Sequence, residues 1–426
     1  MRNLNRRQIL RGGAGALSTL LIRSIASGIP PAYLLNPTLA QAQAMPADIQ
    51  TLILSTSSSG DPLNVNCPGS YVNSNQVENN PNLATATGTF GNQQVTTAEP
   101  WALLPADLRS RLAFFHYSPR TAAHPEYRAT MQMKGSVKNE AGNGSEMFSS
   151  AMAQLGAGPL GTLQNEPIPL TGEDLTYLSM PLQTIKPVDL KELFTPEDQT
   201  LVDLRQTRDQ VLDTLYADLQ VSGNRAQRNF IDRYAQSRSQ ARELGEDLGA
   251  LLNRLPTNED NLNNPLDQII AAVALAKLRI SPVITIKIPF GGDNHQDSDL
   301  VVEATETTSG VGYIGTLWSE LKAQGIQDNV SFATMNVFGR RSYRNSRGGR
   351  DHNQKHAVMV AFGSNIQGGV YGEMNGNGEA VAINGIQPDR TMEAAGRSMG
   401  RALGHSEASM NLRIPTGQLV PNFLRS

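Results

Sequence analysis

The last third of the chain alternates between helix-like and strand-like apolar patterns, and this alternation constrains the fold more than any other feature. Residues 265–279 are an almost wholly apolar run of helical length, and residues 282–290 (PVITIKIPF) are rich in β-branched residues, as a strand is. The same reasoning predicts a helix, two strands and a closing helix over 311–323, 329–338, 357–362 and 388–403. Such alternation predicts an α/β fold whose mostly parallel sheet is covered by helices on both faces.

The earlier part of the chain adds two strands and two long connections. Residues 51–56 (TLILST) and 111–117 (RLAFFHY) predict buried strands. Between them, residues 64–100 are rich in Asn, Thr and Gly with little periodicity, which predicts a long surface loop. A helix start at Thr195, with a proline and two acids after it, precedes leucines at helical spacing. This pattern predicts a helical insertion over about 195–255.

Residues 1–44 have the three parts of a bacterial export signal. Arg6 and Arg7 lie in a basic segment, a moderately apolar run follows, and Ala42-Gln43-Ala44 offers small residues for cleavage. Adjacent arginines are typical of twin-arginine signals, so the expected partner is the twin-arginine export machinery. We therefore expect a mature protein of residues 45–426 that is periplasmic or extracellular. The alternative is a basic N-terminal arm on a cytosolic protein.

Composition excludes several classes of protein. The single cysteine, Cys67, leaves no internal disulfide framework and no cysteine-ligated zinc site. Lys and Arg number 36 against 39 Asp and Glu, so no basic excess indicates a nucleic acid partner. No stretch after residue 45 approaches the roughly 18 consecutive apolar residues of a membrane-spanning helix. We therefore expect no transmembrane segment in the mature chain.

Two pairs of aspartate and histidine follow predicted strands. Asp293 and His295 come just after the strand that ends at residue 290, and Asp351 and His352 lie in the loop after the strand that ends at residue 338. In open α/β sheets, sites form at the carboxyl ends of the strands, so we expect these pairs to lie near each other. The alternatives are a chance Asp-x-His sequence and a salt-bridged turn at the Gly-Arg-Asp-His segment.

Carboxylate oxygens and imidazole nitrogens are common ligands of Zn²⁺, Mn²⁺ and iron. The two pairs are therefore expected to hold one or two divalent metal ions, with Zn, Mn, Ca or Fe as candidates. Two metals about 3.5–4 Å apart activate water and clamp a phosphoryl-type oxygen. Of the remaining histidines, His356 is either a further ligand or a surface residue, His116 is expected in the core, and His405 is assigned no role.

Three ordered segments resemble an exported bacterial family known as domain of unknown function 1501. The segment IIAAVALAKLRISPVITIKIPFGGDNHQD resembles the family's helix, strand and Gly-Gly-(aromatic)-Asp-Thr-His turn. The segment WSELKAQGIQDNVSFATMNVFGRR resembles its helix and the strand that ends in Glu-Phe-Gly-Arg, and NSRGGRDHNQKHAVMVAFGSNIQGGVYGE resembles its Gly-Arg-Asp-His loop. The family looks related to the alkaline phosphatase and sulfatase superfamily, which implies a fold of that kind here.

The resemblance also implies a set of site residues. It makes both Asp/His pairs metal ligands, adds Asp61 from the first strand, and offers His124 as a weaker candidate. Arg340 and Arg350 would neutralise an anionic substrate, with structural ion pairing as the alternative role. A phosphatase-like mechanism needs a hydroxyl nucleophile, and its role falls to one of four residues. These candidates are Ser57, Ser58, Ser59 and Thr121.

The chain departs from the family's pattern at four places. Val337 stands where the family usually has Glu, Asn294 where it has Thr, and Ala123 where many relatives have Ser or Asn. The family's Gly-Gly before Asp61 is reduced to Ser59-Gly60. Loss of the acid at 337 removes a possible ligand or anchor of a ligand. Two functions therefore remain open. One is a metal-dependent hydrolase of phosphate or sulfate esters that acts on an anionic small molecule or polymer, and the other is a non-catalytic exported envelope or binding protein with a degenerate metal site.

Overall fold

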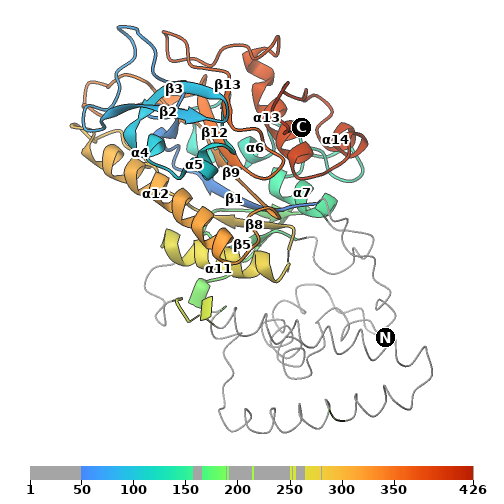
Figure 1. Ribbon diagram of the computed structural model, residues 1–426. Helices are drawn as coiled ribbons and strands as arrows, with labels where there is room; N and C mark the ends of the chain where they lie inside the picture. The colour runs from blue at the N-terminus through green and yellow to red at the C-terminus, as the bar shows by residue number, and fades with distance from the viewer. Residues whose placement is uncertain are drawn as a thin grey trace. The chain divides into compact units, whose positions relative to one another are not determined.

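A seven-stranded sheet organises the part of the chain that the structure describes (Figure 1). This computed structural model describes residues 49–156, 166–188, 190, 214, 250–251, 253–255, 264–279 and 281–425. The predicted export signal, residues 1–44, and most of the predicted helical insertion over about 195–255 lie outside the described residues. The sheet lies in one compact unit formed by residues 44–185 and 261–426.

The strands of the sheet run in the order β13-β4-β12-β9-β1-β8-β5. Their bounds are Thr51–Ser57 (β1), Leu112–Tyr117 (β4), Ile168–Pro169 (β5), Val283–Ile286 (β8), Val330–Asn336 (β9), Ala357–Phe362 (β12) and Gly369–Tyr371 (β13). All neighbours pair in parallel except β12, which is antiparallel to both β4 and β9. The predicted α/β class and mostly parallel sheet are therefore confirmed.

Helices lie against both faces of the sheet (Figure 1). One face carries α11 (Pro265–Lys277) and α12 (Val301–Ala323), and the other carries α6 (Tyr127–Met131), α7 (Phe148–Gly156) and α13 (Thr391–Ala402), with α14 (Glu407–Arg413) beside α13. Side chains alternate accordingly along the strands. Ala361 of β12 belongs to the apolar cluster that includes residues of α7 and α13, whereas the ring of the next residue, Phe362, packs edge-on against Trp318 of α12.

The start of α12 differs from the prediction. The helix begins at Val301 rather than at residue 311, because the carboxylate of Asp297 accepts hydrogen bonds from the amides of Val302 and Glu303 (3.2 and 2.8 Å). The first turns are rich in Thr, Glu and Gly, which hides the helix from a search for apolar periodicity. No helix in the described ranges has the length and apolar character that spanning a bilayer requires.

The predicted surface loop over residues 64–100 is wrong in part. Residues Thr85–Phe90 (β2) and Gln93–Ala98 (β3) form an antiparallel hairpin joined at Gly91. Gly91 has φ +55°, and a Cβ there would lie 1.8 Å from the carbonyl oxygen of Gly368, so this turn needs glycine. Most β2 side chains are polar and at least partly exposed, whereas Phe90 is fully buried. Because so few positions are apolar, the composition resembles that of a loop.

Candidate functional site

Connections from five strands meet at one edge of the sheet. Strands β1, β4, β8 and β9 end there, and antiparallel β12 begins there. His124 follows β4, Asp293 and His295 follow β8, and Asp351 and His352 precede β12. The sheet thus brings the two predicted Asp/His pairs together and adds His124 to them.

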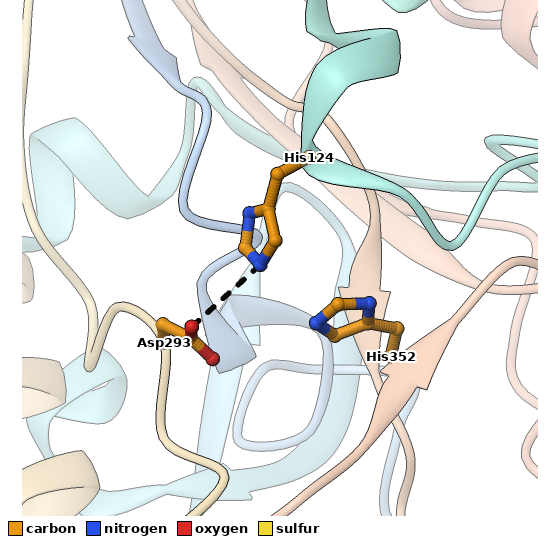
Figure 2. Close-up of side chains that lie close together, drawn as sticks. All are labelled: His124, Asp293 and His352. Carbon is orange, nitrogen blue, oxygen red and sulfur yellow. Dashed lines mark ion pairs between the residues drawn. The ribbon is translucent and has the colours of Figure 1, made fainter.

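Three of these residues offer ligand atoms within 4.8 Å of one another: His124, Asp293 and His352. Figure 2 shows their side chains pointing toward one another, with His124 Nε2 3.6 Å from a carboxylate oxygen of Asp293. His295 lies against this group, because its Nε2 is 2.8 Å from Nε2 of His352 and 3.5 Å from the other carboxylate oxygen of Asp293. We call these four residues the His/Asp cluster.

The outer nitrogen of each imidazole in the cluster is paired with an oxygen that only accepts hydrogen bonds. Nδ1 of His124 contacts the carbonyl of Ser58 (2.7 Å), Nδ1 of His295 contacts the carboxylate of Asp351 (3.1 Å), and Nδ1 of His352 contacts the carbonyl of Ala122. Each Nδ1 must therefore carry the proton. In the neutral form, each Nε2 is left with a lone pair that faces the inside of the cluster.

The charge state of the cluster fits this assignment of protons. Burial lowers the pKa of His352 and the charge of Arg340 lowers it further, which outweighs the opposite effect of the hydrogen bond to the carbonyl of Ala122, so the neutral form of His352 is favoured. Burial alone would raise the pKa of Asp293, but Arg340 beside it holds that pKa below its usual range. The pKa of Asp351 is also lowered, first by a hydrogen bond from Asn345. Three imidazoles and a carboxylate whose pKa is lowered therefore converge, which is a donor set suited to a cation.

Phe338, just beyond β9, fixes the orientation of two imidazoles. Its ring stacks on His352 with centroids 4.1 Å apart and meets His124 edge-on at 4.9 Å. A Cβ on Gly60 would lie 2.0 Å from the Phe338 ring, and Gly60 has φ +63°. The connection after β1 can therefore pass this ring only with glycine at position 60.

Arg340 is fully buried and holds Asp293 from behind. Its Nη2 donates to Asp293 (3.0 Å) and to the carbonyl of Ser59 (2.7 Å), its Nε donates to the carbonyl of Gly60 (2.6 Å), and its Nη1 donates to the carbonyl of Arg350 (3.2 Å). All of these hydrogen bonds go to groups of the protein itself. Its role in the structure is to orient the carboxylate of Asp293.

Arg350 lies outside the cluster in a buried ion pair. Its Nε donates to Glu303 (2.8 Å), and both side chains are 0% exposed. Glu303 also accepts hydrogen bonds from Asn66, Asn80 and Asn294. Structural ion pairing, the alternative role drawn from the sequence, therefore describes Arg350. The sequence analysis missed Glu303, because its position fell before the predicted start of the helix.

Asp61 also lies outside the group formed by His124, Asp293 and His352, although it is close to that group. Its side chain is buried, and one carboxylate oxygen accepts a hydrogen bond from the amide of Gly292 (2.9 Å). The other oxygen has no hydrogen-bond partner among the described residues. Burial raises the pKa of the carboxyl group, and the side chain of Ser57 offsets part of this effect. An orphaned buried oxygen of this kind favours either a protonated acid or a bound cation.

The hydroxyl groups of the candidate nucleophiles make no hydrogen bond to the cluster within the described part of the chain. The hydroxyl of Thr121 is buried and accepts a hydrogen bond from the amide of Ala123 (3.2 Å), which shapes the turn before His124. Ser59 is half-buried, and its amide donates to the hydroxyl of Ser57 (3.2 Å). Among the described residues, the cluster side chains have no hydrogen bond from a hydroxyl group. The structure therefore singles out none of these serines and threonines.

A second pair of histidines lies buried behind Arg340. Nδ1 of His116 is 2.8 Å from Nε2 of His356, and Nε2 of His116 contacts the carbonyl of Pro68 (2.8 Å). Nδ1 of His356 is 3.1 Å from the carboxamide of Asn64, which also bonds the backbone of Arg340. His116 is a core residue, as the sequence predicts, and His356 is neither exposed nor part of the cluster.

Val337 belongs to the apolar cluster packed between the sheet and α13, and it is fully buried there. The position at which the family usually carries Glu therefore contributes apolar packing here. The His/Asp cluster described above is complete without it.

The comparison with protein families supports the resemblance drawn from the motifs. The model of a family described as "Protein of unknown function (DUF1501)" matches residues 199–406. This span includes Asp293, His295, Asp351 and His352, whereas Asp61 and His124 precede it. No curated protein matches the chain.

Proposed function

We propose that the chain is an exported, metal-dependent hydrolase of phosphate or sulfate esters, with a fold like that of alkaline phosphatases and sulfatases. One observation carries the proposal. The Nε2 lone pairs of His295 and His352 face each other at 2.8 Å beside the carboxylate of Asp293. Because both outer nitrogens already face hydrogen-bond acceptors, the two Nε2 atoms can lie this close only if they share a proton or bind a common metal cation, and we propose the metal.

The residues present fit a transition metal. Imidazole suits Zn²⁺, Mn²⁺ and Fe²⁺, whereas Ca²⁺ prefers a shell of oxygens, so we propose one of the first three. His124, His295, His352 and Asp293 would hold it, and the orphaned oxygen of Asp61 makes that residue the candidate ligand of a second ion. A bound metal of this kind supplies charge stabilisation to an ester oxygen.

The surrounding chain keeps these ligands in place. The carbonyls of Ser58 and Ala122 and the carboxylate of Asp351 hold the imidazoles in one tautomer, and such partners raise the basicity of a ligand. Ser59 is our candidate for the attacking hydroxyl, because its carbonyl is bound by the arginine that orients Asp293. Retained turnover in Ser59→Ala would assign the attack to water instead.

One observation favours the second candidate, a non-catalytic exported binding protein. Arg340 and Arg350 are both fully buried and donate to groups of the protein itself. Neither guanidinium is free to neutralise an anionic ester, which phosphoryl- and sulfuryl-type chemistry usually requires. Such a protein would keep the metal and lack turnover.

The test begins with the metal content of the mature protein, residues 45–426, purified without a histidine tag. Wild type should retain about one or two equivalents of a transition metal, and Asp293→Asn and His352→Ala should each lose it. Asp389→Asn, an exposed acid in the loop before α13, serves as the matched control. A folded, metal-free wild type would refute the proposal.

The second step separates the two candidate functions. Metal-loaded wild type is assayed with 4-nitrophenyl phosphate and 4-nitrophenyl sulfate, with and without a chelator. Turnover that disappears with the chelator, and in His352→Ala, supports the hydrolase. Stable metal binding without turnover of these two esters or of the corresponding glucose esters supports the binding protein.

A further inference from the structure

Two cavities flank the His/Asp cluster, and they differ in charge. The first, of about 310 Å³, is lined by three aspartates, which are Asp293, Asp297 and Asp299. The second, of about 250 Å³, shares His352 with the cluster and is lined by the cations of Arg341 and Lys355. Carboxylates repel an anionic ester, and cations attract it. The side of His352 is therefore the side from which such a substrate reaches the cluster.

The wall of the cavity beside His352 is polar on nearly all sides. Besides the two cations, it presents a serine, a tyrosine, three carboxamides and a carboxylate, from Ser342, Tyr343, Asn353, Gln354, Asn377 and Glu379. Within this described wall, the methyl group of Ala122 is the one aliphatic side chain. The wall thus offers both hydrogen-bond donors and hydrogen-bond acceptors.

Several of these groups are already fixed by one another. Lys355 forms an ion pair with Glu379, and Asn353 donates to the carbonyl of Gly378 (2.7 Å). Arg341 donates to the hydroxyl of Tyr343 (2.7 Å) while its guanidinium lies over that ring. The wall is therefore partly organised before any ligand binds, which lowers the entropic cost of binding.

The chemistry of the wall selects among alcohols. An apolar alcohol, such as an aryl or alkyl group, would remove water from Lys355, Glu379 and Arg341 without replacing the lost hydrogen bonds. A hydroxyl group both donates and accepts, so it can satisfy the ammonium, the guanidinium and the carboxylate alike. Several hydroxyl groups on a small ring match several such partners at once.

We propose that this cavity binds the alcohol part of the ester and that this alcohol is polyhydroxylated, as a monosaccharide is. The inference rests on the proposed hydrolysis of phosphate or sulfate esters at the cluster. The volume of about 250 Å³ is below the range of about 300–1,000 Å³ that is typical of pockets for drug-sized ligands, which suits a single sugar ring.

The kinetic test compares two kinds of ester on the metal-loaded mature protein. Glucose 6-phosphate and glucose 6-sulfate carry the sugar, and the 4-nitrophenyl esters carry an apolar ring. Lys355→Met and Asn377→Ala should each lower kcat/KM for the glucose ester roughly tenfold through KM, as the loss of one strong hydrogen bond does. Turnover of the 4-nitrophenyl ester should fall much less than turnover of the glucose ester in both variants, because its ring makes no hydrogen bond to either side chain.

The control is Lys322→Met. This variant removes a similarly exposed lysine of α12 that forms an ion pair with Asp107, and it should leave the turnover of both kinds of ester unchanged. Ligand-observed NMR with glucose, galactose and mannose measures binding to the cavity without turnover. Sugar signals that weaken in Lys355→Met and Asn377→Ala, but not in Lys322→Met, support the inference.

The two failures are distinguishable. Absence of sugar signals with wild type, or equal loss of turnover for both kinds of ester, overturns the inference even where 4-nitrophenyl esters are hydrolysed. Failure of metal-loaded wild type to hydrolyse any of the four esters overturns the proposed function, whatever the sugar binding shows.

Discussion

Acidification should destabilise the protein through the buried pair of His116 and His356. Burial lowers the pKa of His116 from 6.5 to about 4 and lowers that of His356 well below 6.5. Below pH 6.5 the unfolded chain therefore binds protons that the folded chain does not, so the free energy of unfolding falls with pH. For His116 the loss begins near pH 6.5 and is complete near pH 4.

The size of this loss follows from the two pKa values of His116. A shift from 6.5 to about 4 corresponds to about 3 kcal/mol in total. Between pH 7 and pH 4.5, where the folded side chain is still mostly neutral, the expected loss from His116 is about 2 kcal/mol. This is a large part of the roughly 5–15 kcal/mol by which proteins of this kind are stable.

Urea unfolding of the mature protein at both pH values, with a chelator present, measures the loss. His116→Gln is the matched variant, because its carboxamide can still donate to the carbonyl of Pro68 but does not titrate. The variant is expected to be less stable at pH 7 and to lose about 2 kcal/mol less than wild type on going to pH 4.5. Equal losses in the two proteins would refute the reasoning.

Three further predictions concern other parts of the chain. Arg350→Met should destabilise the protein by about 3–5 kcal/mol, because it leaves the buried charge of Glu303 unpaired. Urea unfolding measures this, and adding Glu303→Leu should restore part of the loss. Gly60→Ala should reduce metal retention, because its methyl group would displace the ring of Phe338, as metal analysis of the folded variant would show. Replacing Arg6–Arg7 with two lysines should abolish export, measured by cell fractionation.

Each of these three predictions has an outcome that contradicts it. A double variant at 350 and 303 that is no more stable than Arg350→Met would show that the unpaired charge is not the cause. Full metal content in Gly60→Ala would show that the ring of Phe338 is not needed to hold the cluster in place. Mature protein in the periplasm of cells that express the double-lysine variant would exclude the twin-arginine route.

The fold was predictable where strands are buried on both faces. The runs at 51–56, 282–290 and 357–362 consist mainly of β-branched and apolar residues, so composition alone marks them as strands. The hairpin of β2 and β3 was not predictable in this way, because most of its side chains are polar and at least partly exposed. The apolar content of a segment therefore predicts a strand only where that strand is buried.

The candidate site was predictable only where its residues follow a strand signal in the sequence. Asp293, His295, Asp351 and His352 follow strand signals and were identified. The carbonyls of Ser58 and Ala122, which fix two tautomers, have no sequence signal, because every residue has a carbonyl. The importance of His124 depends on β4 ending at the same edge as β9 although β12 lies between them, and strand order is a property of the whole sheet.

The position of β1 has a consequence for synthesis. This strand lies between β8 and β9, whose paired residues follow its own by about 230 and 280 residues. At about 5–20 residues per second, a ribosome needs roughly 14–56 s to pass from β1 to β9. During that time the segment TLILSTS lacks both of its partners, and an unpaired apolar strand readily pairs with other chains. The order of the strands thus sets the time for which β1 stays unpaired during synthesis, and no substitution within β1 can shorten that time.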